Sequence, residues 1–279
     1  MVRHRGAFKP DNPNPYELSR GKIESFIKCK ACFWLNRVAG IKEPDFPSFT
    51  LNTTTDILLK RDADRVRGKQ TMPLLEANGL GHLIPFEHED LENWTNSLQF
   101  GAGDRYFNTV HEASNIRFGG GLDDVYQNSE TGQLHIVDYK STAQGTRSPD
   151  NYERKPVSLD DPWKTGYKRQ MDMYVWIMQQ KGFDTSDIGY FVYVDGQHKD
   201  LEGMLTDEDP SIGWMQFGVQ VIAYETDTSW VEPTLIEIRD FLESRKTCPP
   251  HALPREGDVY SGCDTGRWLN AVVDALDKN

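Results

Sequence analysis

The sequence predicts an α/β protein in which a central mixed β-sheet is flanked by helices. Short runs of apolar, β-branched and aromatic residues at 134–140 and 190–194 are typical of buried strands. A long helical segment at 163–181 separates these runs, and other helical segments precede and follow them. Hydrophobic residues make up 37% of the 279 residues, which is enough to build a core.

The chain is predicted to consist of a short leader and one domain. Residues 1–20 carry Pro10, Pro13 and Pro15 among polar residues, which predicts a flexible leader. Residues 21–279 are predicted to form a single domain, and no internal repeat or low-complexity segment divides them.

Two helices are predicted before the strands. Residues 20–38 include Ile23 and Phe26, which are spaced for one face of a helix. A second helix is predicted from Thr53 to Gly68, where a few apolar positions stand among many charged residues. Residues 69–102 have a mixed pattern that predicts no definite order of elements.

A strand, a hairpin turn and a second strand are predicted in the centre of the chain. Residues 116–126 are predicted to form a strand that contains three consecutive glycines. Residues 129–132 have the composition of a hairpin turn, and the strand at 134–140 follows it. After the helix at 163–181, the elements expected are strands at 190–194 and 218–224 and a helix at 234–242.

The composition argues against several classes of protein. Lysine and arginine number 31 against 43 aspartates and glutamates, so the formal charge is −12 and the surface is a poor non-specific binder of nucleic acid. That charge is compatible with a carboxylate site that holds cations. No apolar run approaches the ~18 residues of a membrane span. No apolar stretch follows the basic N-terminus, which predicts a cytoplasmic protein. No phosphate-binding loop of an ATP-driven motor is present.

The clearest chemical pattern lies on the central strand. Side chains two residues apart on a strand share a face, so Asp138 and Lys140 point one way while Val137 and Tyr139 point the other. The hairpin is expected to bring Asp123 close to Asp138. Two converging carboxylates repel each other unless a divalent cation such as Mg²⁺ lies between them. With a lysine beside it, such a site suits metal-assisted phosphodiester hydrolysis, and the alternative is a structural ion pair at a sheet edge.

The following helix adds further polar side chains. Gln170 and Tyr174 are four residues apart and therefore share a helix face. Lys168 and Arg169 precede them, and these two basic residues either contact phosphate or form a solvated basic turn. The neighbouring apolar residues of this helix are expected to belong to the core.

Three segments occur in a characteristic order: Gly120–Asp123, Val137–Ser141 and Gln170–Tyr174. Together they resemble the PD-(D/E)XK nuclease superfamily in its RecB-like branch, where such segments lie on a strand, the next strand and a following helix. The resemblance spans about residues 119–174. It implies a restriction-endonuclease-like core, a dependence on Mg²⁺ or Mn²⁺, and a DNA substrate.

The same resemblance implies roles for individual residues. Asp123 and Asp138 match the metal-binding acids, and Lys140 matches the catalytic lysine. Gln170 and Tyr174 match the helix motif that contacts DNA or supports the site.

The RecB-like branch also carries an acid or a histidine on an upstream helix. Asp56 is the best match for a further metal ligand, because it lies near the start of the charged second helix. Asp62, His111 and Glu112 are alternatives. An exposed helix charge without a metal is the other interpretation of Asp56.

The four cysteines form the last pattern. Cys29 and Cys32 have the C-x-x-C spacing that can present two thiolates to one metal. Cys248 and Cys263 lie in the Pro- and Gly-rich tail. The arrangement resembles RecB-like nucleases, including CRISPR-associated ones, in which four cysteines hold a [4Fe–4S] cluster.

The C-terminal cysteines depart from that resemblance. Gly266 stands where a second, closely spaced cysteine would follow Cys263. Cys248 is one candidate for the fourth ligand and His251 is another, and a histidine would favour Zn²⁺ over a cluster. Four reduced cysteines without a metal are the remaining alternative.

The leading hypothesis is a metal-dependent DNA nuclease. The second is a catalytically inactive nucleic-acid-binding or assembly module of the same fold, which the net charge and the incomplete cysteine pattern favour. The third is an unrelated α/β enzyme in which Asp138 and Lys140 are a structural pair. The third would gain if the carboxylates of Asp123 and Asp138 were more than about 8 Å apart, too far to share a metal.

Overall fold

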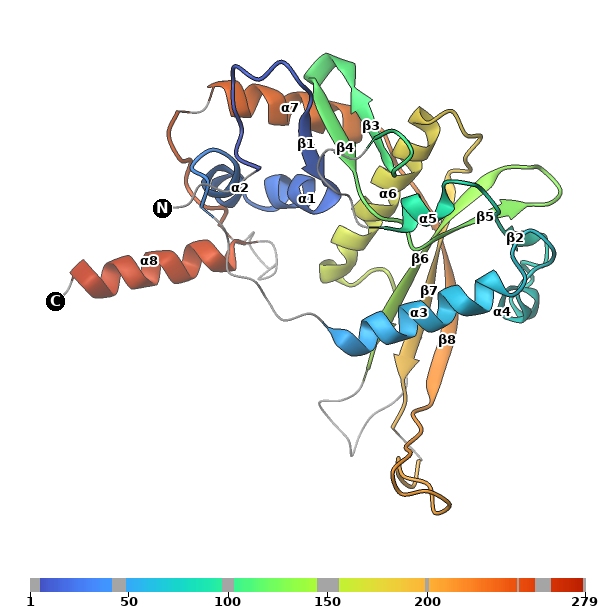
Figure 1. The fold of residues 1–279 in the computed structure, drawn as a ribbon. Coiled ribbons are helices and arrows are strands. Elements are labelled where there is room, and N and C mark those ends of the chain that lie inside the picture. The colour runs from blue at the N-terminus through green and yellow to red at the C-terminus, as the bar shows by residue number, and fades with distance from the viewer. Residues whose placement is uncertain are drawn as a thin grey trace.

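The computed structural model places helices around two β-sheets (Figure 1), which confirms the predicted α/β class with a mixed sheet flanked by helices. The described residues are 6–41, 49–96, 103–144, 156–198, 201–244, 246–253 and 262–277. The first five residues of the expected leader lie outside them. Among the described residues, no helix combines the length and the apolar character needed to cross a membrane.

Eight α-helices lie within the described residues, together with short 3₁₀ turns at Glu112–Ser114 and Pro162–Lys164. The helices are α1 (Arg20–Lys28), α2 (Lys30–Arg37), α3 (Thr50–Asp64), α4 (Pro73–Ala77), α5 (Leu91–Thr95), α6 (Thr165–Gln180), α7 (Val231–Ser244) and α8 (Asp264–Asp277). Helices α3, α6 and α7 lie where helical periodicity predicted them. Helices α4 and α5 fall in the segment for which no order was predicted, and α8 falls in the tail.

The larger sheet has five strands. In spatial order they are β2 (Leu83–Pro85), β5 (Asp124–Asn128), β6 (Leu134–Thr142), β7 (Ile188–Gly196) and β8 (Phe217–Glu225). Strands β6 and β7 run parallel and their other neighbours run antiparallel, so the sheet is mixed. The predicted turn joins β5 to β6, and Gly132 adopts a φ of 82° there, which a residue with a side chain rarely does.

The two faces of this sheet carry separate cores. On one face, Val137 and Tyr139 of β6 pack in a cluster that includes Ala63 of α3. On the other face, Ile136 packs in the main core with the apolar residues of α6. Figure 1 shows α3 and α6 on opposite faces of the sheet. Strand alternation therefore directs Asp138, which lies two residues after Ile136, toward α6.

The smaller sheet has three strands, β1 (Tyr16–Ser19), β4 (Ile116–Gly119) and β3 (Asn108–His111), in that order. Strand β1 pairs in parallel with β4, and Leu18 is fully buried between the sheet and the core. The last residues of the expected leader are therefore part of the fold. The buried Leu18 explains this difference, because its hydrophobic burial orders the chain after Pro15.

The single strand predicted over residues 116–126 is two strands that belong to different sheets. The chain leaves β4 after Gly119 and enters β5 at Asp124, and we call the intervening residues 120–123 the crossing segment. A Cβ atom on Gly120 would lie 2.7 Å from a ring carbon of Tyr174, so glycine is required at this close approach. The glycines therefore mark a passage between sheets and not a continuous strand.

The single helix predicted over residues 20–38 is also divided. Cys29 has an extended backbone (φ −160°, ψ 104°) and separates α1 from α2. Its N–H still donates to the carbonyl of Ser25, so α1 closes its last turn before the chain changes direction. Cys29, at this break, and Cys32, in α2, lie next to residues of the C-terminal segment.

Candidate active site

A cavity of about 740 Å³ lies where α3, β6, α6 and the crossing segment meet. Segments far apart in the chain contribute to its wall. The predicted site residues that line it are Asp56, Asp123, Lys140, Gln170 and Tyr174. The structure thus brings together side chains that sequence analysis selected separately.

Asp138 is buried next to this cavity, and both of its oxygens contact protein side chains. Gln170 Nε2 donates a hydrogen bond of 2.7 Å to Asp138 Oδ1, and Lys140 Nζ forms an ion pair with Oδ2. Burial lowers the pKa of Lys140, but the carboxylates of Asp138 and Asp123 outweigh burial and raise it. Lys140 is therefore a fixed cation at the edge of the cavity.

Asp123 is oriented by the backbone of the neighbouring strand. The N–H of Tyr139 donates to Asp123 Oδ2 at 2.8 Å, which holds the carboxylate against β6. Burial and, next, the charge of Asp138 raise the pKa of Asp123 to about 6, against the opposing effect of Lys140 and Lys60. Such a shift is typical of carboxylates that share a cation site.

Asp56 faces the same cavity from α3. Lys60, one helical turn later, places its Nζ 3.0 Å from Asp56 Oδ2 and 3.8 Å from Asp123 Oδ1. The lysine ammonium thus bridges the two carboxylates. Burial and the charge of Asp123 raise the pKa of Asp56. Within the described part of the chain, the buried Oδ1 of Asp56 has no hydrogen-bond partner.

The alternatives to Asp56 lie elsewhere. Asp62 is exposed and pairs with Arg65 on α3. His111 ends β3, where its Nδ1 lies 2.9 Å from the hydroxyl of Ser114. Asp62, His111 and Glu112 are all among the described residues, and none of them lines the cavity.

Tyr174 closes one wall of the cavity. Its ring packs against Gly120, and burial raises the pKa of its hydroxyl, which also interacts with Arg20 at the start of α1. Arg20 is half-buried and lines the cavity as well, so it adds its positive charge to those of Lys60 and Lys140. Lys140 Nζ also lies 5.2 Å from the ring centre of Tyr167 on α6.

The two basic residues before Gln170 do not line the cavity. Arg169 donates hydrogen bonds of 2.8 and 2.6 Å to the carboxylate oxygens of Glu24 and so joins α6 to α1. Lys168 is partly exposed and lies 3.9 Å from Asp160. Arg169 therefore has a structural role in joining two helices. Lys168 lies at the surface, outside the cavity.

These groups make up a carboxylate site with a lysine two residues after Asp138 on the same strand and an amide on a helix. Residues 17–212 match the family model of the PD-(D/E)XK nuclease superfamily. The chain belongs to this superfamily. The matched span includes the cavity and all of its predicted residues, and it covers most of the chain. A comparison with curated proteins finds no match.

The PD-(D/E)XK superfamily is one of metal-dependent nucleases, so membership is compatible with phosphodiester hydrolysis and implies a nucleic-acid substrate. The match begins at residue 17, within β1, which agrees with the folded state of that strand. Lys60 and Arg20 also line this site, and neither was predicted from the sequence. Lys60 has a signal in the i,i+4 spacing from Asp56, but that spacing is also common in exposed ion pairs. Arg20 has no comparable signal.

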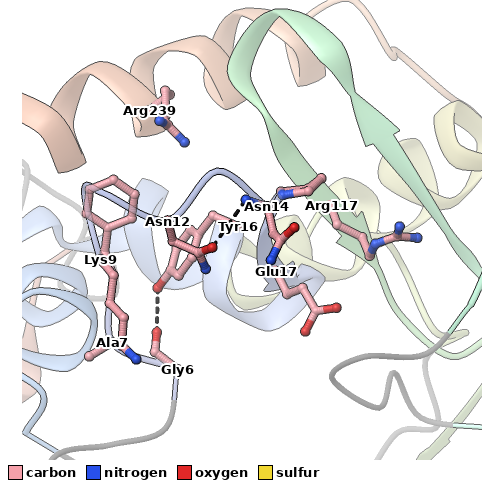
Figure 2. Close-up of a pocket in the computed structure, with 11 residues that line it drawn as sticks. Gly6, Ala7, Lys9, Asn12, Asn14, Tyr16, Glu17, Arg117 and Arg239 are labelled. Carbon is pink, nitrogen blue, oxygen red and sulfur yellow. Dashed lines mark hydrogen bonds between the residues drawn. The ribbon is translucent and has the colours of Figure 1, made fainter.

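A second cavity, of about 600 Å³, lies apart from the acids (Figure 2). It is formed by the chain before β1 and the start of β1, together with Arg117 of β4 and Arg239 of α7. The hydroxyl of Tyr16 donates to the carbonyl of Gly6 at 2.6 Å and holds the first described residues in place. Among its described lining residues, Glu17 is the sole carboxylate, so this cavity lacks the acid pair that hydrolysis would use.

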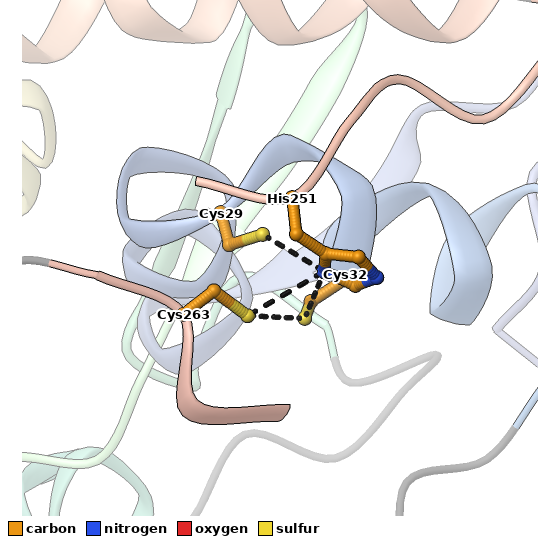
Figure 3. A group of neighbouring side chains, drawn as sticks. All are labelled: Cys29, Cys32, His251 and Cys263. Atoms are coloured by element: carbon orange, nitrogen blue, oxygen red, sulfur yellow. Dashed lines mark hydrogen bonds between the residues drawn. The ribbon is translucent and has the colours of Figure 1, made fainter. Parts of the chain in front are cut away.

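The C-x-x-C pair belongs to a separate cluster (Figure 3). The donor atoms of Cys29, Cys32, His251 and Cys263 all lie within 4.8 Å of one another, so this group could bind a metal or a cluster. Burial raises the pKa of Cys29, but N–H donors, first that of Ala252, outweigh burial and lower it to about 7. A thiolate is the form that binds metal.

Cys248 is not part of this group within the described residues. It is exposed, and its sulfur lies 3.9 Å from the carbonyl of Ala31. Of the two candidates for the fourth ligand, the group contains His251 and not Cys248. The cause is the path of the chain, which turns the histidine ring toward the three sulfurs, as Figure 3 shows.

Proposed function

We propose that this chain is a Mg²⁺- or Mn²⁺-dependent deoxyribonuclease of the RecB-like branch. The observation that carries the proposal is the bonded set of Gln170, Asp138 and Lys140, in which buried Asp138 joins two residues of the cavity that Asp123 also lines. The order of the three segments and the polar helix motif that ends at Tyr174 support the branch.

The donors at the site fit a hard divalent cation. Asp56, Asp123 and Asp138 supply carboxylate oxygens, which Mg²⁺ and Mn²⁺ prefer. The ammonium of Lys60 between Asp56 and Asp123 shows that a positive charge is stable at that point. Asp56 Oδ1, which has no hydrogen-bond partner among the described residues, offers a further ligand oxygen. A divalent ion bound there would supply an activated water and neutralise charge on the scissile phosphate.

The protein groups around this position have distinct tasks. Lys140 is held by Asp138, so its ammonium can stabilise negative charge as it develops on the phosphate. Gln170 is a positioning residue, because it bonds Asp138 and fixes the carboxylate plane. Asp123, with a pKa of about 6, is largely deprotonated at neutral pH and can therefore bind a cation.

The cavity carries its own positive groups although the chain has a net charge of −12. Arg20, Lys60 and Lys140 all line it. Such a local cluster can bind the phosphates of one strand while the rest of the surface repels nucleic acid. DNA is the substrate proposed, on the strength of the RecB-like segments.

The test is a cleavage assay on labelled single-stranded and double-stranded DNA, with RNA of the same sequence, in Mg²⁺, Mn²⁺ or EDTA. Cleavage of DNA is expected with either metal and not with EDTA. Asp138→Asn and Lys140→Met are each expected to lower the rate by at least about 100-fold, because each removes a group at the developing charge.

A matched pair of variants on α3 tests the third acid. Asp56→Asn is expected to lower cleavage and to raise the metal concentration that is needed. Asp62→Asn lies on the same helix but at the surface, and it is expected to have no effect.

Unchanged cleavage in Asp138→Asn or Lys140→Met would contradict the proposal. DNA binding without cleavage in any metal would instead support the binding module, and cleavage of RNA alone would exclude a deoxyribonuclease.

A further inference from the structure

The Cys/His group joins the two ends of the chain. Cys29 separates α1 from α2, Cys32 lies in α2, and Cys263 precedes α8. His251 reaches the group from the segment between α7 and α8 (Figure 3). The three cysteines are buried, and the structure records no disulfide between them.

The distances in this group are those of ligands around a single ion. His251 Nδ1 lies 3.5, 3.6 and 3.5 Å from the sulfurs of Cys29, Cys32 and Cys263 respectively. The sulfurs of Cys32 and Cys263 are 3.3 Å apart. Tetrahedral Zn²⁺, with Zn–S near 2.3 Å and Zn–N near 2.0 Å, places its ligand atoms about 3.5–3.8 Å apart. The three N–S distances match that spacing, the S–S distance is slightly shorter, and every other pair lies within 4.8 Å.

An iron–sulfur cluster needs more room. In a [4Fe–4S] cluster each cysteine binds a different iron, and the cube of irons and sulfides separates the four ligands. Donor atoms that all lie within 4.8 Å of one another leave space for one ion only. Three thiolates with one imidazole are also a common set for structural zinc.

Gly266 explains why histidine completes the set. A Cβ atom at position 266 would collide with the Cβ and Cγ atoms of His251 and lie 2.8 Å from its Nδ1. Any side chain there would push the imidazole away from the sulfurs. The glycine that replaces the expected second cysteine therefore makes room for the histidine ligand.

Backbone donors prepare two of the sulfurs for a cation. The N–H of Ala252 donates to Cys29 Sγ at 3.5 Å, and the N–H of Gly266 donates to Cys263 Sγ at 3.2 Å. Such bonds stabilise thiolates and orient them, as partners outside the ligand set do in metal sites. Hydrogen bonds from Ala252 and from Gly266 of α8 thus orient two ligands of the same site.

We propose that Cys29, Cys32, His251 and Cys263 bind one Zn²⁺ ion, which fastens α8 and the segment before it to the α1–α2 pair. The site is structural, because four protein ligands leave no open position for a substrate. The proposal is independent of the deoxyribonuclease proposal, since its evidence lies outside the acid cavity.

The first experiment measures metal in the purified full-length protein by mass spectrometry and records its visible absorption. One zinc per chain and a colourless solution are expected. The zinc is then removed with a chelator and replaced by Co²⁺, which should give the intense visible bands of a tetrahedral thiolate site. Iron and sulfide in the protein, with a broad brown absorption, would overturn the proposal, as would the absence of any bound metal after incubation with zinc.

The second experiment compares two cysteines of the C-terminal segment. Cys263→Ser is expected to reduce zinc from one ion per chain to nearly none, whereas Cys248→Ser is expected to keep the full amount. Gly266→Ala is expected to weaken zinc binding about 10–100-fold, as loss of ligand positioning does. If Cys263→Ser does not fold, the zinc content of Gly266→Ala and the cobalt spectrum of the unaltered chain still decide whether these residues bind zinc. Equal loss of zinc in Cys248→Ser would contradict the assignment of His251.

Discussion

Asp123 is held in its charged form at an energetic cost. Burial and the nearby Asp138 raise its pKa from 3.8 to about 6 in the folded protein. A raised pKa means that the folded state binds this proton more tightly than the unfolded state does. The contribution of Asp123 to the free energy of unfolding therefore falls as the pH rises from about 4 to about 6, and it stays low above that.

Asp123→Asn is expected to stabilise the metal-free protein at neutral pH. Asparagine removes the buried charge and keeps an oxygen to accept the Tyr139 N–H. A gain of about 1–3 kcal/mol is expected at pH 7, because each unit of pKa shift corresponds to about 1.4 kcal/mol. The gain should disappear near pH 4, where the wild-type carboxyl is protonated. Urea unfolding at a series of pH values, in EDTA, measures it.

The exposed Asp62 on α3 provides the control for that experiment. Asp62→Asn should change stability little at any pH, because its ion pair with Arg65 is at the surface. A gain in Asp123→Asn that is the same at pH 4 and pH 7 would show that the charge is not its source. Asp123→Asn is also expected to lose metal-dependent cleavage, so the stability and the activity of this variant should change in opposite directions.

At the scale of single residues, the sequence predicted the acids of the site but not Lys60, the cation between Asp56 and Asp123. Asp138 and Lys140 were found because strand alternation places them on one face. Lys60 was not found, because an Asp–Lys pair four residues apart on a charged helix is usually a surface pair. Its importance depends on burial and on Asp123, which comes from a distant segment.

Among the elements, the crossing segment at residues 120–123 sets the geometry of the site. It ends in Asp123, and it packs closely against α6 through Gly120 and Tyr174. The passage from the smaller sheet to the larger one therefore determines where this carboxylate lies. A change in its packing should move Asp123 relative to β6.

Gly120→Ala is expected to impair cleavage more than folding. The added methyl would lie 2.7 Å from a ring carbon of Tyr174, so either the ring or the crossing segment must shift. A loss of about 1–3 kcal/mol in stability is expected from such overpacking. Cleavage should fall by 10-fold or more, since a displaced acid holds a metal poorly. Urea unfolding and the DNA cleavage rate are the two measurements.

Gly103→Ala serves as the matched control for that variant. Apart from its chain neighbours, no atom of the described residues lies within 4 Å of a Cβ built at Gly103, so the substitution should leave both stability and cleavage nearly unchanged. If Gly120→Ala lowers stability but leaves the cleavage rate per folded molecule unchanged, the crossing segment does not position Asp123.

Regular elements were predictable where one pattern dominates. Strands β6 and β7 are apolar runs, and α6 has a continuous apolar face, so each was found with nearly correct bounds. The break at Cys29 was not predicted, because the local sequence contains neither proline nor glycine there. Tertiary contacts of the Cys/His group accompany that break, and a local pattern does not report them.

At the scale of the whole molecule, helix α1 connects the acid cavity with the Cys/His group. Arg20 at its start lines the cavity, and Cys29 follows its end. Between them, Glu24 pairs with Arg169 of α6. The two sites are thus linked through one rigid helix. The sequence suggested a closure of the chain ends through the cysteines, but only the folded path of the C-terminal segment distinguishes His251 from Cys248.

Removal of the zinc should loosen the ends of the chain and leave the central sheet intact. Gly266 is the one buried residue of α8, so this helix is held mainly where it begins, at Cys263. Hydrogen exchange of the chelator-treated protein should show lost protection in α8 and around Cys29. Strands β6 and β7 should keep theirs, because their cores do not include the cluster. A uniform loss of protection would mean that the ion supports the whole fold, and no change in α8 would mean that it fastens nothing.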